Sequence, residues 1–271
     1  MTMTMSQTAR MQHRTLPYAG LAGIVIVYLV IVQGLGALLS QGTESSYATF
    51  PDVETVLRVM TIPVGLSALF GIAVISVLRV WPDVIHEDNP VQSWVWIVPI
   101  SMLVSAVIVT DYANLGTLDS GLLATMVLSS LLVGIGEELM FRGVVIQTLR
   151  GNGMTEHRVA LWSSVIFGGA HITNLFSEGV QAIGQVVVVC LAGFLFYLTY
   201  RVTGTIIGPI LMHAIWDFSL FSANIGDPDP DAVPRYLVWV PMLVVIILGI
   251  IVYVRRDRID PATTETVAAT S

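Results

Sequence analysis

The stretch at 122–148 reads LLATMVLSSLLVGIGEELMFRGVVIQT, and it decides the class of fold that this chain adopts. A helix needs about 20 largely apolar residues to cross the hydrocarbon layer of a bilayer. This stretch is long enough, although Glu137, Glu138 and Arg142 interrupt it. A charged side chain inside a bilayer costs a few kcal/mol, so such residues face the protein interior and usually mark function. The stretch therefore predicts a membrane-spanning helix that carries part of a buried polar site.

The composition of the whole chain also indicates a membrane protein. Of its 271 residues, 55% are hydrophobic and 11% are charged, whereas about 25% are charged in an average soluble domain. So few charges cannot cover a globular surface in water. All twelve basic residues are arginines, and nineteen acidic residues bring the net charge to −7. This balance and the single Cys190 exclude a cationic nucleic-acid-binding protein and a disulfide-stapled domain.

Seven further stretches are apolar and long enough to span a bilayer. We therefore predict an all-α fold, a polytopic integral membrane helix bundle with about eight transmembrane helices. The predicted spans are 16–40, 57–81, 93–110, 122–148, 159–176, 180–200, 205–223 and 233–254. The first follows Arg10 and Arg14 as a signal peptide would, but its apolar run exceeds the roughly 7–15 residues of a signal core. We expect this span to be retained.

The arginines predict the orientation of the bundle, because cytoplasmic loops of membrane proteins are enriched in basic residues. With the N-terminus inside, only Arg58 and Arg235 lie at outer ends of spans. The inner ends carry Arg10, Arg14, Arg79, Arg150, Arg158, Arg201, Arg255, Arg256 and Arg258. The outer side instead carries Glu44, Asp52, Glu54, Asp111, Asp119, Glu178, Asp227, Asp229 and Asp231. We expect a multi-pass protein of the cell membrane with both termini in the cytoplasm.

Six ionisable residues fall inside the predicted spans and are the candidate functional residues. They are Glu137, Glu138 and Arg142 in the fourth span, His171 in the fifth, and His213 and Asp217 in the seventh. Glu138 and Arg142 are four residues apart, so on a helix they share a face and can form an ion pair. His213 and Asp217 have the same spacing. Glu137 is rotated by about 100° from Glu138, which leaves it free to point elsewhere.

Three of these residues are expected at one depth. Glu137 precedes Arg150 by 13 residues, and His171 follows Arg158 by 13. His213 follows Arg201 by 12. At about 1.5 Å per residue, each lies roughly 18–20 Å from the inner end of its helix. Three helices therefore bring a carboxylate and two imidazoles to one level, as a single buried site requires.

This set of side chains suits two kinds of chemistry. A carboxylate with imidazoles can deprotonate a water and stabilise an oxyanion, as peptide hydrolysis requires. The same groups can hold a catalytic metal with three protein ligands and one open position. On spacing alone, buried charges in a polytopic protein are also typical of transporters and proton pathways. The spacing by itself leaves these alternatives open.

The motifs that carry these residues resemble those of a known family. The string Glu137-Glu138-Leu-Met-Phe-Arg142-Gly143 is similar to the Glu-Glu-x-x-x-Arg motif of the CPBP family. This family, also called Abi, includes type II CAAX prenyl endopeptidases and bacteriocin-processing or bacteriocin-immunity proteins. Phe167-x-x-x-His171 and His213-x-x-x-Asp217 resemble two further motifs of the family, in the same order. The resemblance covers about residues 120–220.

The resemblance implies an intramembrane endopeptidase with an all-helical fold and a cavity that opens to the cytoplasm. Glu137 would be the base that activates water, braced by the ion pair of Glu138 and Arg142. His171, His213 and Asp217 would bind a metal or polarise the scissile carbonyl group. The resemblance thus implies either a divalent metal such as zinc, on Glu137, His171, His213 and Asp217, or a metal-free glutamate mechanism.

One position departs from the eukaryotic CAAX enzymes, which have Asn where this chain has Asp217. A carboxylate suits a metal better than an amide does, and it is a poorer oxyanion donor unless it is protonated. This departure puts the amide-donor role in doubt and is typical of a prokaryotic-type member.

The motifs also divide the chain into predicted segments. These are a cytoplasmic tail at 1–15, N-terminal transmembrane helices at 16–118, a CPBP-like catalytic core at 119–223, and a last transmembrane helix with a cytoplasmic tail at 224–271. We expect the bilayer and a membrane-associated peptide or protein substrate as partners, and no nucleic acid. The alternative is a non-proteolytic transporter or immunity-type protein that uses the same residues to bind a ligand or proton.

Overall fold

The computed structural model describes residues 15–41, 49–89, 91–174, 181–227, 239–255 and 259. Within these residues the chain is helical, with two isolated β-bridges, Phe50–Ile225 and His86–Thr205, and no strand. The predicted all-α class is confirmed. The α-helices are α2 (Tyr18–Leu29), α3 (Leu35–Leu39), α4 (Val53–Val56), α5 (Ile62–Leu78), α6 (Trp81–Ile85), α7 (Ile97–Val109), α8 (Tyr112–Leu115), α9 (Ser120–Glu138), α10 (Ile146–Gly151), α11 (Glu156–Ala170), α13 (Gln181–Thr203), α14 (Ile207–Phe221) and α15 (Trp239–Val254).

Six short segments of tighter or wider helix complete the bundle. Three are π-helical: η2 (Val30–Gly34), η3 (Leu57–Thr61) and η5 (Leu139–Val145). Three are 3₁₀-helical: η4 (Ser93–Trp96), η6 (His171–Asn174) and η7 (Ser222–Asn224). Because the π-helical segments continue their neighbouring α-helices, several long helices run through from one end of the bundle to the other.

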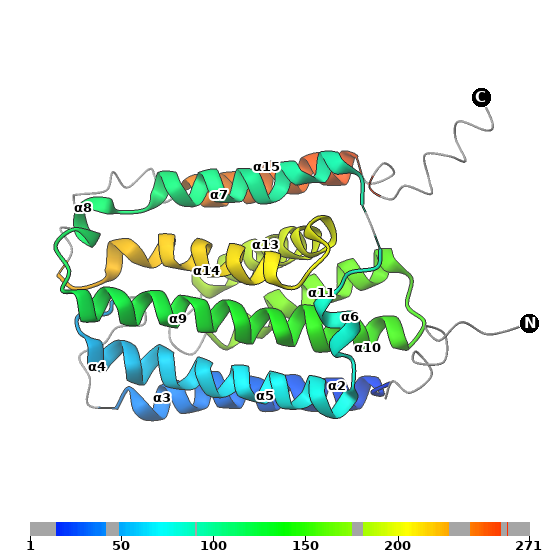
Figure 1. Cartoon of the computed structure of the whole chain (residues 1–271), viewed down its shortest axis with the longest axis horizontal. Helices are drawn as coiled ribbons and strands as arrows, with labels where there is room; N and C mark the ends of the chain where they lie inside the picture. Colours follow the sequence, from blue (N-terminus) through cyan, green and yellow to red (C-terminus); the bar gives the residue numbers. More distant parts are fainter. Residues whose placement is uncertain are drawn as a thin grey trace, which may run out of the picture.

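The long helices lie side by side along one axis of the molecule (Figure 1). Helices α7 and α15 form one side of the bundle, and α2 to α5 form the opposite side. Between them lie α9, α11, α13 and α14, with α9 packed against α14 and α5, and α11 packed against α13. The three motif-bearing helices therefore occupy the middle of the bundle.

Each predicted span overlaps a helix, although residues 175–176, 180 and 233–238 of these spans lie outside the described residues. Among the described residues, four helical stretches are long and apolar enough to cross a membrane: Tyr18–Leu39, Val53–Leu78, Ser120–Gly151 and Ile183–Thr203. Ser93–Val109 and Leu243–Val252 are shorter apolar helices. The other two predicted spans correspond to α11 and α14, which have 15 residues each. A membrane helix bundle is confirmed as the architecture, whereas the number of helices that cross the bilayer stays a prediction.

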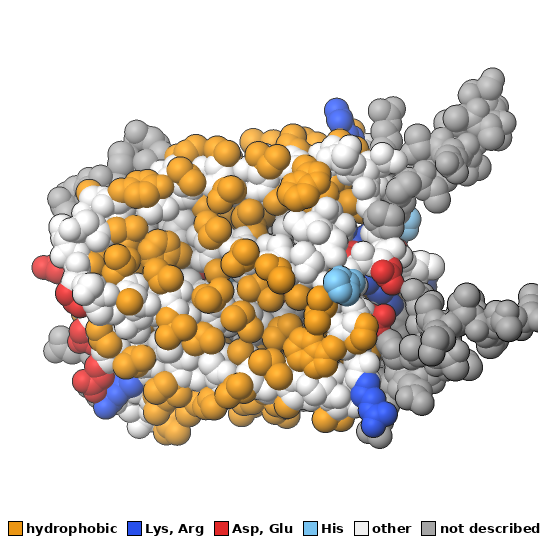
Figure 2. Space-filling model, viewed as in Figure 1, with side chains coloured by type: hydrophobic (Ala, Val, Ile, Leu, Met, Phe, Trp, Pro, Cys, Tyr) orange, Lys and Arg blue, Asp and Glu red, His pale blue; other side chains and the backbone are white. Residues whose placement is uncertain are grey.

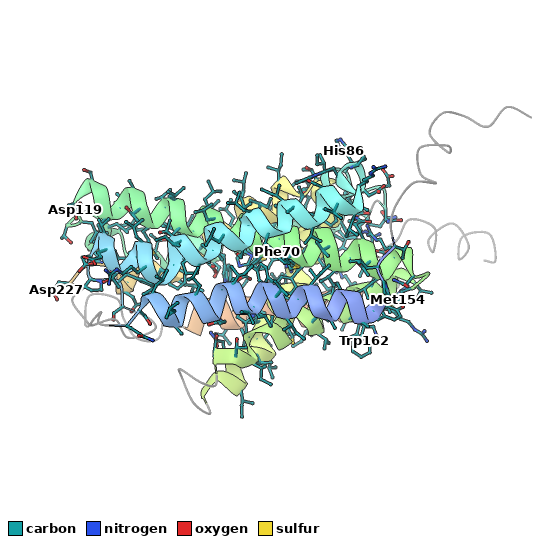
Figure 3. The ribbon with its side chains drawn as sticks, turned by 90° about the horizontal axis from the view of Figure 1, so that it is seen from below. Phe70, His86, Asp119, Met154, Trp162 and Asp227 are labelled. Carbon is teal, nitrogen blue, oxygen red and sulfur yellow. The ribbon has the colours of Figure 1, made fainter. Side chains whose placement is uncertain are left out.

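The two ends of the bundle differ in charge. One end, which we call the arginine end, carries five arginines within the last or first turn of a helix or next to it: Arg79, Arg150, Arg158, Arg201 and Arg255. Asp52, Asp111, Asp119 and Asp227 lie at the other end, which we call the aspartate end. Figure 3 shows Asp119 and Asp227 at this end and His86 and Met154 at the opposite one. Nine further predicted markers lie outside the described residues: Arg10, Arg14, Arg235, Arg256, Arg258, Glu44, Glu178, Asp229 and Asp231.

The surface between the two ends is apolar. Hydrophobic side chains cover most of the face in Figure 2, and the charged side chains gather at its two ends. Val30, Leu69 and Val77 are each more than 60% exposed on the outside of the bundle. Exposed apolar side chains in this number would be unfavourable in water, but they match a hydrocarbon surround.

The fourth span is built from α9, η5 and α10 in continuous succession. It begins at Ser120 because the Asp119 side chain accepts hydrogen bonds from the N–H groups of Gly121 and Leu122, at 2.9 and 3.0 Å. Such a cap satisfies donors that a helix start leaves unpaired. The small residue Gly134 lets this helix approach α14 closely, since a Cβ there would lie 2.5 Å from the Ile210 carbonyl oxygen.

An ion-pair cluster joins four segments at the arginine end. Arg150 donates hydrogen bonds to Glu156 at 2.5 and 3.1 Å and to Glu87 at 2.9 Å. The Tyr197 hydroxyl donates to the same Glu156 at 2.7 Å, and Arg201 lies 3.6 Å from it. Partial burial would raise the pKa of the Glu156 carboxyl, but the hydrogen bonds and positive charges of its partners outweigh burial and lower this pKa.

Because α9 and α14 approach closely at Gly134, we predict that a larger residue at this position destabilises the protein. We expect Gly134→Ala to push α9 and α14 apart and to destabilise the protein by about 1–3 kcal/mol, the usual cost of overpacking. Gly23→Ala is the matched control, because nothing lies within 4 Å of a Cβ at that helical position. Thermal unfolding in detergent measures both variants, and equal melting temperatures for the two would contradict this packing.

From the lowered pKa of Glu156 we predict how the stability of the folded protein depends on pH. The pKa of Glu156 is lower in the folded than in the unfolded chain, so the unfolded chain binds this proton more readily. The cluster therefore stabilises the protein fully above the unfolded pKa of about 4.3, and this stability is lost as pH falls through the folded pKa. We expect the melting temperature to fall less steeply below that pH in Glu156→Gln than in the wild type. Glu54→Gln, at an exposed ion pair, serves as the control.

Candidate active site

The fourth span places its three charged residues where the helix widens. Glu137 and Glu138 are the last residues of α9, and Arg142 lies in the π-helical segment η5 that follows. Such π-helical turns occur mostly at functional sites. Arg142 Nη1 lies 3.0 Å from Glu138 Oε1, and both side chains are almost completely buried. The ion pair predicted from the four-residue spacing is therefore present.

This ion pair also binds two groups from other helices. Arg142 Nη2 donates a hydrogen bond to the carbonyl oxygen of Gly193 in α13, at 2.8 Å. His213 Nδ1 of α14 lies 2.8 Å from Glu138 Oε1, and because a carboxylate oxygen only accepts, the imidazole is the donor. Glu138 and Arg142 thus connect the fourth span to both α13 and α14.

Aromatic rings enclose the same group of charges. The Arg142 guanidinium lies over the ring of Phe167, 4.6 Å from its centroid, and 5.4 Å from the centroid of Phe196. The Phe196 ring stacks on the His213 imidazole at 4.5 Å with an interplanar angle of 17°. Phe167 also contacts both imidazoles, at centroid distances of 5.2 Å to His171 and 5.9 Å to His213. These contacts fix the orientation of the two histidine rings.

The outer nitrogen of His213 faces two carboxylates. Its Nε2 lies 3.8 Å from Glu137 Oε2 and 3.6 Å from Asp217 Oδ2. Glu137 Oε2 is buried and has no hydrogen-bond partner among the described residues. Burying a carboxylate oxygen without a partner is costly. The Glu137 side chain as a whole is 17% exposed at the cavity wall, so its carboxylate is suited to accept a hydrogen bond from a small molecule, such as water, in the site.

His171 lies just after α11, in the 3₁₀ turn η6. Its Nδ1 lies 3.0 Å from the carbonyl oxygen of Phe167, and since a carbonyl oxygen only accepts, Nδ1 carries the proton. In the neutral imidazole, Nε2 then has a free lone pair. The four-residue spacing of Phe167 and His171 thus serves two purposes, because the ring and the carbonyl group of Phe167 both hold the imidazole.

A cavity of about 500 Å³ contains the site. Glu137, His171, His213 and Asp217 line it, together with Phe167 and Phe196. Glu138 and Arg142 do not line it but lie behind His213, where they hold the imidazole. The structure therefore brings all six predicted residues together, four at the cavity wall and two behind it. Their catalytic roles stay predictions.

The predicted donors do not form a metal site as they are arranged. Among the described residues, no group of three or more His, Cys, Asp and Glu side chains is placed to hold a metal ion. The contacts of His213 Nε2 with Glu137 and Asp217 remain longer than hydrogen bonds. The metal set of Glu137, His171, His213 and Asp217 stays a prediction, and the chemistry below is derived from the protein groups alone.

The direction in which the cavity extends bears on two of the expectations above. On α14 its lining residues run from His213 through Trp216 to Phe221, towards the aspartate end. On α9 they run from Glu137 back to Val133, towards the same end. With arginines inside, this end would face outwards; the predicted orientation and the predicted opening of the cavity to the cytoplasm both stay predictions.

Several residues of the site did not stand out in the sequence. Gly193 is one of 23 glycines, and no local pattern shows that its carbonyl oxygen binds Arg142. A Cβ at Gly193 would lie 2.7 Å from the Phe167 ring, so the absence of a side chain there makes room for the ring. Phe196 looks like an ordinary apolar residue of its span. Gln33 and Gln185, which also line the cavity, are uncharged polar residues in apolar stretches, and that signal could have identified them.

Comparison with known proteins finds a family that this part of the chain is similar to. Residues 119–219 match the family model described as type II CAAX prenyl endopeptidase Rce1-like. No curated protein and no solved structure matches the chain. The matched segment contains all six candidate residues, from Glu137 to Asp217, in one membrane helix bundle. Residues 119–219 of this membrane protein are therefore similar to the type II CAAX prenyl endopeptidases, the family that the three motifs resemble.

The burial of the Glu138–Arg142 pair makes a stability prediction. Arg142→Gln leaves the Glu138 carboxylate buried with less compensation, and breaking a buried pair in this way costs about 3–5 kcal/mol. Arg58→Gln is the matched control, because Arg58 pairs with Glu54 at the same four-residue spacing but on the exposed surface. Exposed helix pairs contribute about 0.3–0.5 kcal/mol.

Thermal unfolding in detergent compares these variants. We expect the double variant Glu138→Gln/Arg142→Gln to recover part of the stability lost in Arg142→Gln, because it removes the uncompensated charge as well. Similar losses in Arg142→Gln and Arg58→Gln would show that burial does not set the strength of this pair.

Proposed function

We propose that this protein is an intramembrane endopeptidase that hydrolyses a peptide bond in a membrane-associated protein or peptide. The observation that supports the proposal most directly is the buried, unpartnered Oε2 of Glu137, 3.8 Å from His213 Nε2 at the wall of a cavity. A water in the cavity beside this carboxylate would donate a hydrogen bond to a group that has no hydrogen-bond partner among the described residues. The family match of residues 119–219 supports the same class of reaction.

In the proposed reaction, Glu137 acts as the general base. Its carboxylate takes a proton from the water while the water oxygen bonds to the carbonyl carbon of the scissile peptide. The carbon–nitrogen bond then breaks, and the proton held by Glu137 passes to the leaving nitrogen. A site with few other hydrogen-bond donors near Glu137 favours this transfer, because the base has little else to bind.

The histidines are proposed to orient water and to stabilise the oxyanion. His213 donates its Nδ1 proton to Glu138, so its Nε2 is directed towards Glu137, Asp217 and the cavity. When Nε2 also carries a proton, it can donate to the developing oxyanion, with nearby carboxylates balancing the charge. His171, held by Phe167, presents its Nε2 to the same cavity. Glu138 and Arg142 position His213 and do not touch the substrate.

Two versions of the mechanism differ in whether a metal takes part. A divalent ion on the predicted donors would polarise the carbonyl group and activate the water. Metal analysis of the purified wild type and of His213→Ala separates the versions. A stoichiometric ion that is lost in His213→Ala would support a metal enzyme, and equal, near-zero contents would support the glutamate mechanism.

The proposal predicts the effect of one isosteric substitution. We expect Glu137→Gln to lower peptide cleavage by about 10²–10⁴-fold, the usual contribution of a general base, while the protein still inserts and melts near the wild-type temperature. Glu54→Gln, which removes an exposed carboxylate, should leave cleavage unchanged. Unaltered cleavage by purified Glu137→Gln would contradict the assignment of Glu137.

The measurement compares membranes from cells that express the wild type or Glu137→Gln. Mass spectrometry identifies new peptide termini that accumulate with the wild type alone, and a quenched fluorescent peptide made from such a sequence then reports the rate in proteoliposomes. Ligand-dependent uptake by the same proteoliposomes, without any cleavage, would instead support the transporter alternative.

A further inference from the structure

The cavity extends from the site towards the aspartate end. Beyond the catalytic residues, its wall includes Gln33 and Ser40 on the first span, Met60 on the second, and Gln185 on α13. Along its own helical stretch, each of Gln33, Met60 and Gln185 is nearer to the aspartate end than to the arginine end, and Ser40 directly follows α3. The lining of the cavity therefore extends from the site towards the aspartate end of the bundle.

Large buried side chains pack next to the site on the side of the arginine end. Beyond Glu138, towards the arginine end, Phe141 and Arg142 are about 1% exposed and Ile146 is fully buried. Tyr200 of α13 is also fully buried and donates hydrogen bonds to the carbonyl oxygens of Asp83 and Val84 in α6, at 2.8 and 3.0 Å. These side chains are tightly packed, whereas a separate cavity of about 650 Å³, lined by Glu156, Tyr197 and Arg201 among others, lies elsewhere at the arginine end.

The wall of the cavity carries amide groups at membrane depth. Gln33 Nε2 donates to Asn174 Oδ1 at 3.2 Å, and Asn174 Nδ2 donates to Gln185 Oε1 at 3.0 Å. Three helical segments thus contribute to one amide network, of which Asn174 is fully buried while Gln33 and Gln185 line the cavity. Polar side chains in a bilayer are costly and usually functional. A wall that offers such groups suits a polar occupant better than a purely apolar one.

An extended peptide has the chemistry that such a wall accommodates. Away from water, its backbone N–H and C=O groups need partners. Primary amides supply both kinds, since each has a donor and an acceptor. No hydrogen bond is recorded within the described residues for Gln33 Oε1 or Gln185 Nε2, so these atoms retain capacity for an occupant.

We propose that the substrate reaches the site from the aspartate end, as an extended polypeptide segment that lies along Gln185 and Gln33. With arginines at the cytoplasmic face, the aspartate end lies at the outer face of the membrane. The substrate class is then a protein or peptide that exposes its cleavage segment on the extracytoplasmic side. The identity of the occupant rests on the proposed function, whereas the direction of access rests on the cavity.

Thiol labelling tests the direction of access without a known substrate. Cys190 is the sole cysteine of the chain, so Cys190→Ala provides a background without thiols. Single cysteines are then introduced by Ser40→Cys and Gln33→Cys in the cavity and by Asn152→Cys at the arginine end. Val30→Cys is the matched control for Gln33→Cys, because both residues lie in η2 but Val30 is 63% exposed on the apolar outside. A membrane-impermeant maleimide is applied to intact cells and to inside-out vesicles, and labelling is read as a shift in mass.

We expect Ser40→Cys and Gln33→Cys to be labelled in intact cells and Asn152→Cys in inside-out vesicles. Val30→Cys should react from neither side, since a thiol surrounded by lipid stays protonated and inaccessible to the reagent. Labelling of Gln33→Cys from the same side as Asn152→Cys, or from neither side, would overturn the proposal. Labelling of both cavity variants from the cytoplasmic side alone would overturn the assignment of the outer face.

The labelling outcome does not depend on proteolysis, so it separates this proposal from the proposed function. If Gln33→Cys is labelled as expected but no cleavage is ever found, access holds and the endopeptidase assignment fails. Once a cleaved peptide is identified, that peptide should slow the labelling of Gln33→Cys at least tenfold and leave Asn152→Cys unaffected. Equal labelling rates with and without the peptide would overturn the peptide's position along Gln33.

Discussion

The architecture of the site depends on one buried carboxylate, Glu138. Its Oε1 accepts hydrogen bonds from both Arg142 and His213, and Arg142 in turn donates to the carbonyl group of Gly193. Inside a bilayer these groups cannot exchange partners with water, so they depend on partners within the protein, although Glu138 Oε2 has none among the described residues. The requirement links the fourth span to α13 and α14 in a single arrangement, and the catalytic geometry follows from it.

The aromatic side chains extend this constraint to both histidines. Phe196 stacks on His213, and Phe167 lies between Arg142 and the two imidazoles. The absence of a side chain at Gly193 makes this possible, since the Phe167 ring occupies the space that a Cβ would take. A peptidase site needs its base and oxyanion partners to be held before the substrate arrives. Packing of rings against charges supplies that rigidity here without involving water.

The cavity relates the site to the membrane. Charged residues lie at the two ends of the bundle and at the site, and the surface between them is apolar. The cavity is lined by amides and apolar side chains on the aspartate side of Glu137, whereas Phe141, Arg142 and Ile146 are buried on the arginine side. This arrangement is the basis of the access route proposed above.

The sequence by itself determined the class of fold and the identity of the six polar residues. Apolar runs of sufficient length predict helices regardless of how those helices pack, and an ionisable residue within such a run stands out because its burial is costly. Spacings of four residues likewise predicted the pair of Glu138 and Arg142 from local geometry alone. Equal distances from Arg150, Arg158 and Arg201 predicted that Glu137, His171 and His213 share one level.

Only the tertiary structure decided which groups surround these residues and from which side they can be reached. The contacts of Gly193 and Phe196 join residues about 50 positions apart in the sequence, and nothing local distinguishes this glycine or this phenylalanine from others in their span. The direction of the cavity depends on how side chains from several helices fill the space above and below Glu137. Packing between helices is a property of their surfaces in combination, so no single span contains that information.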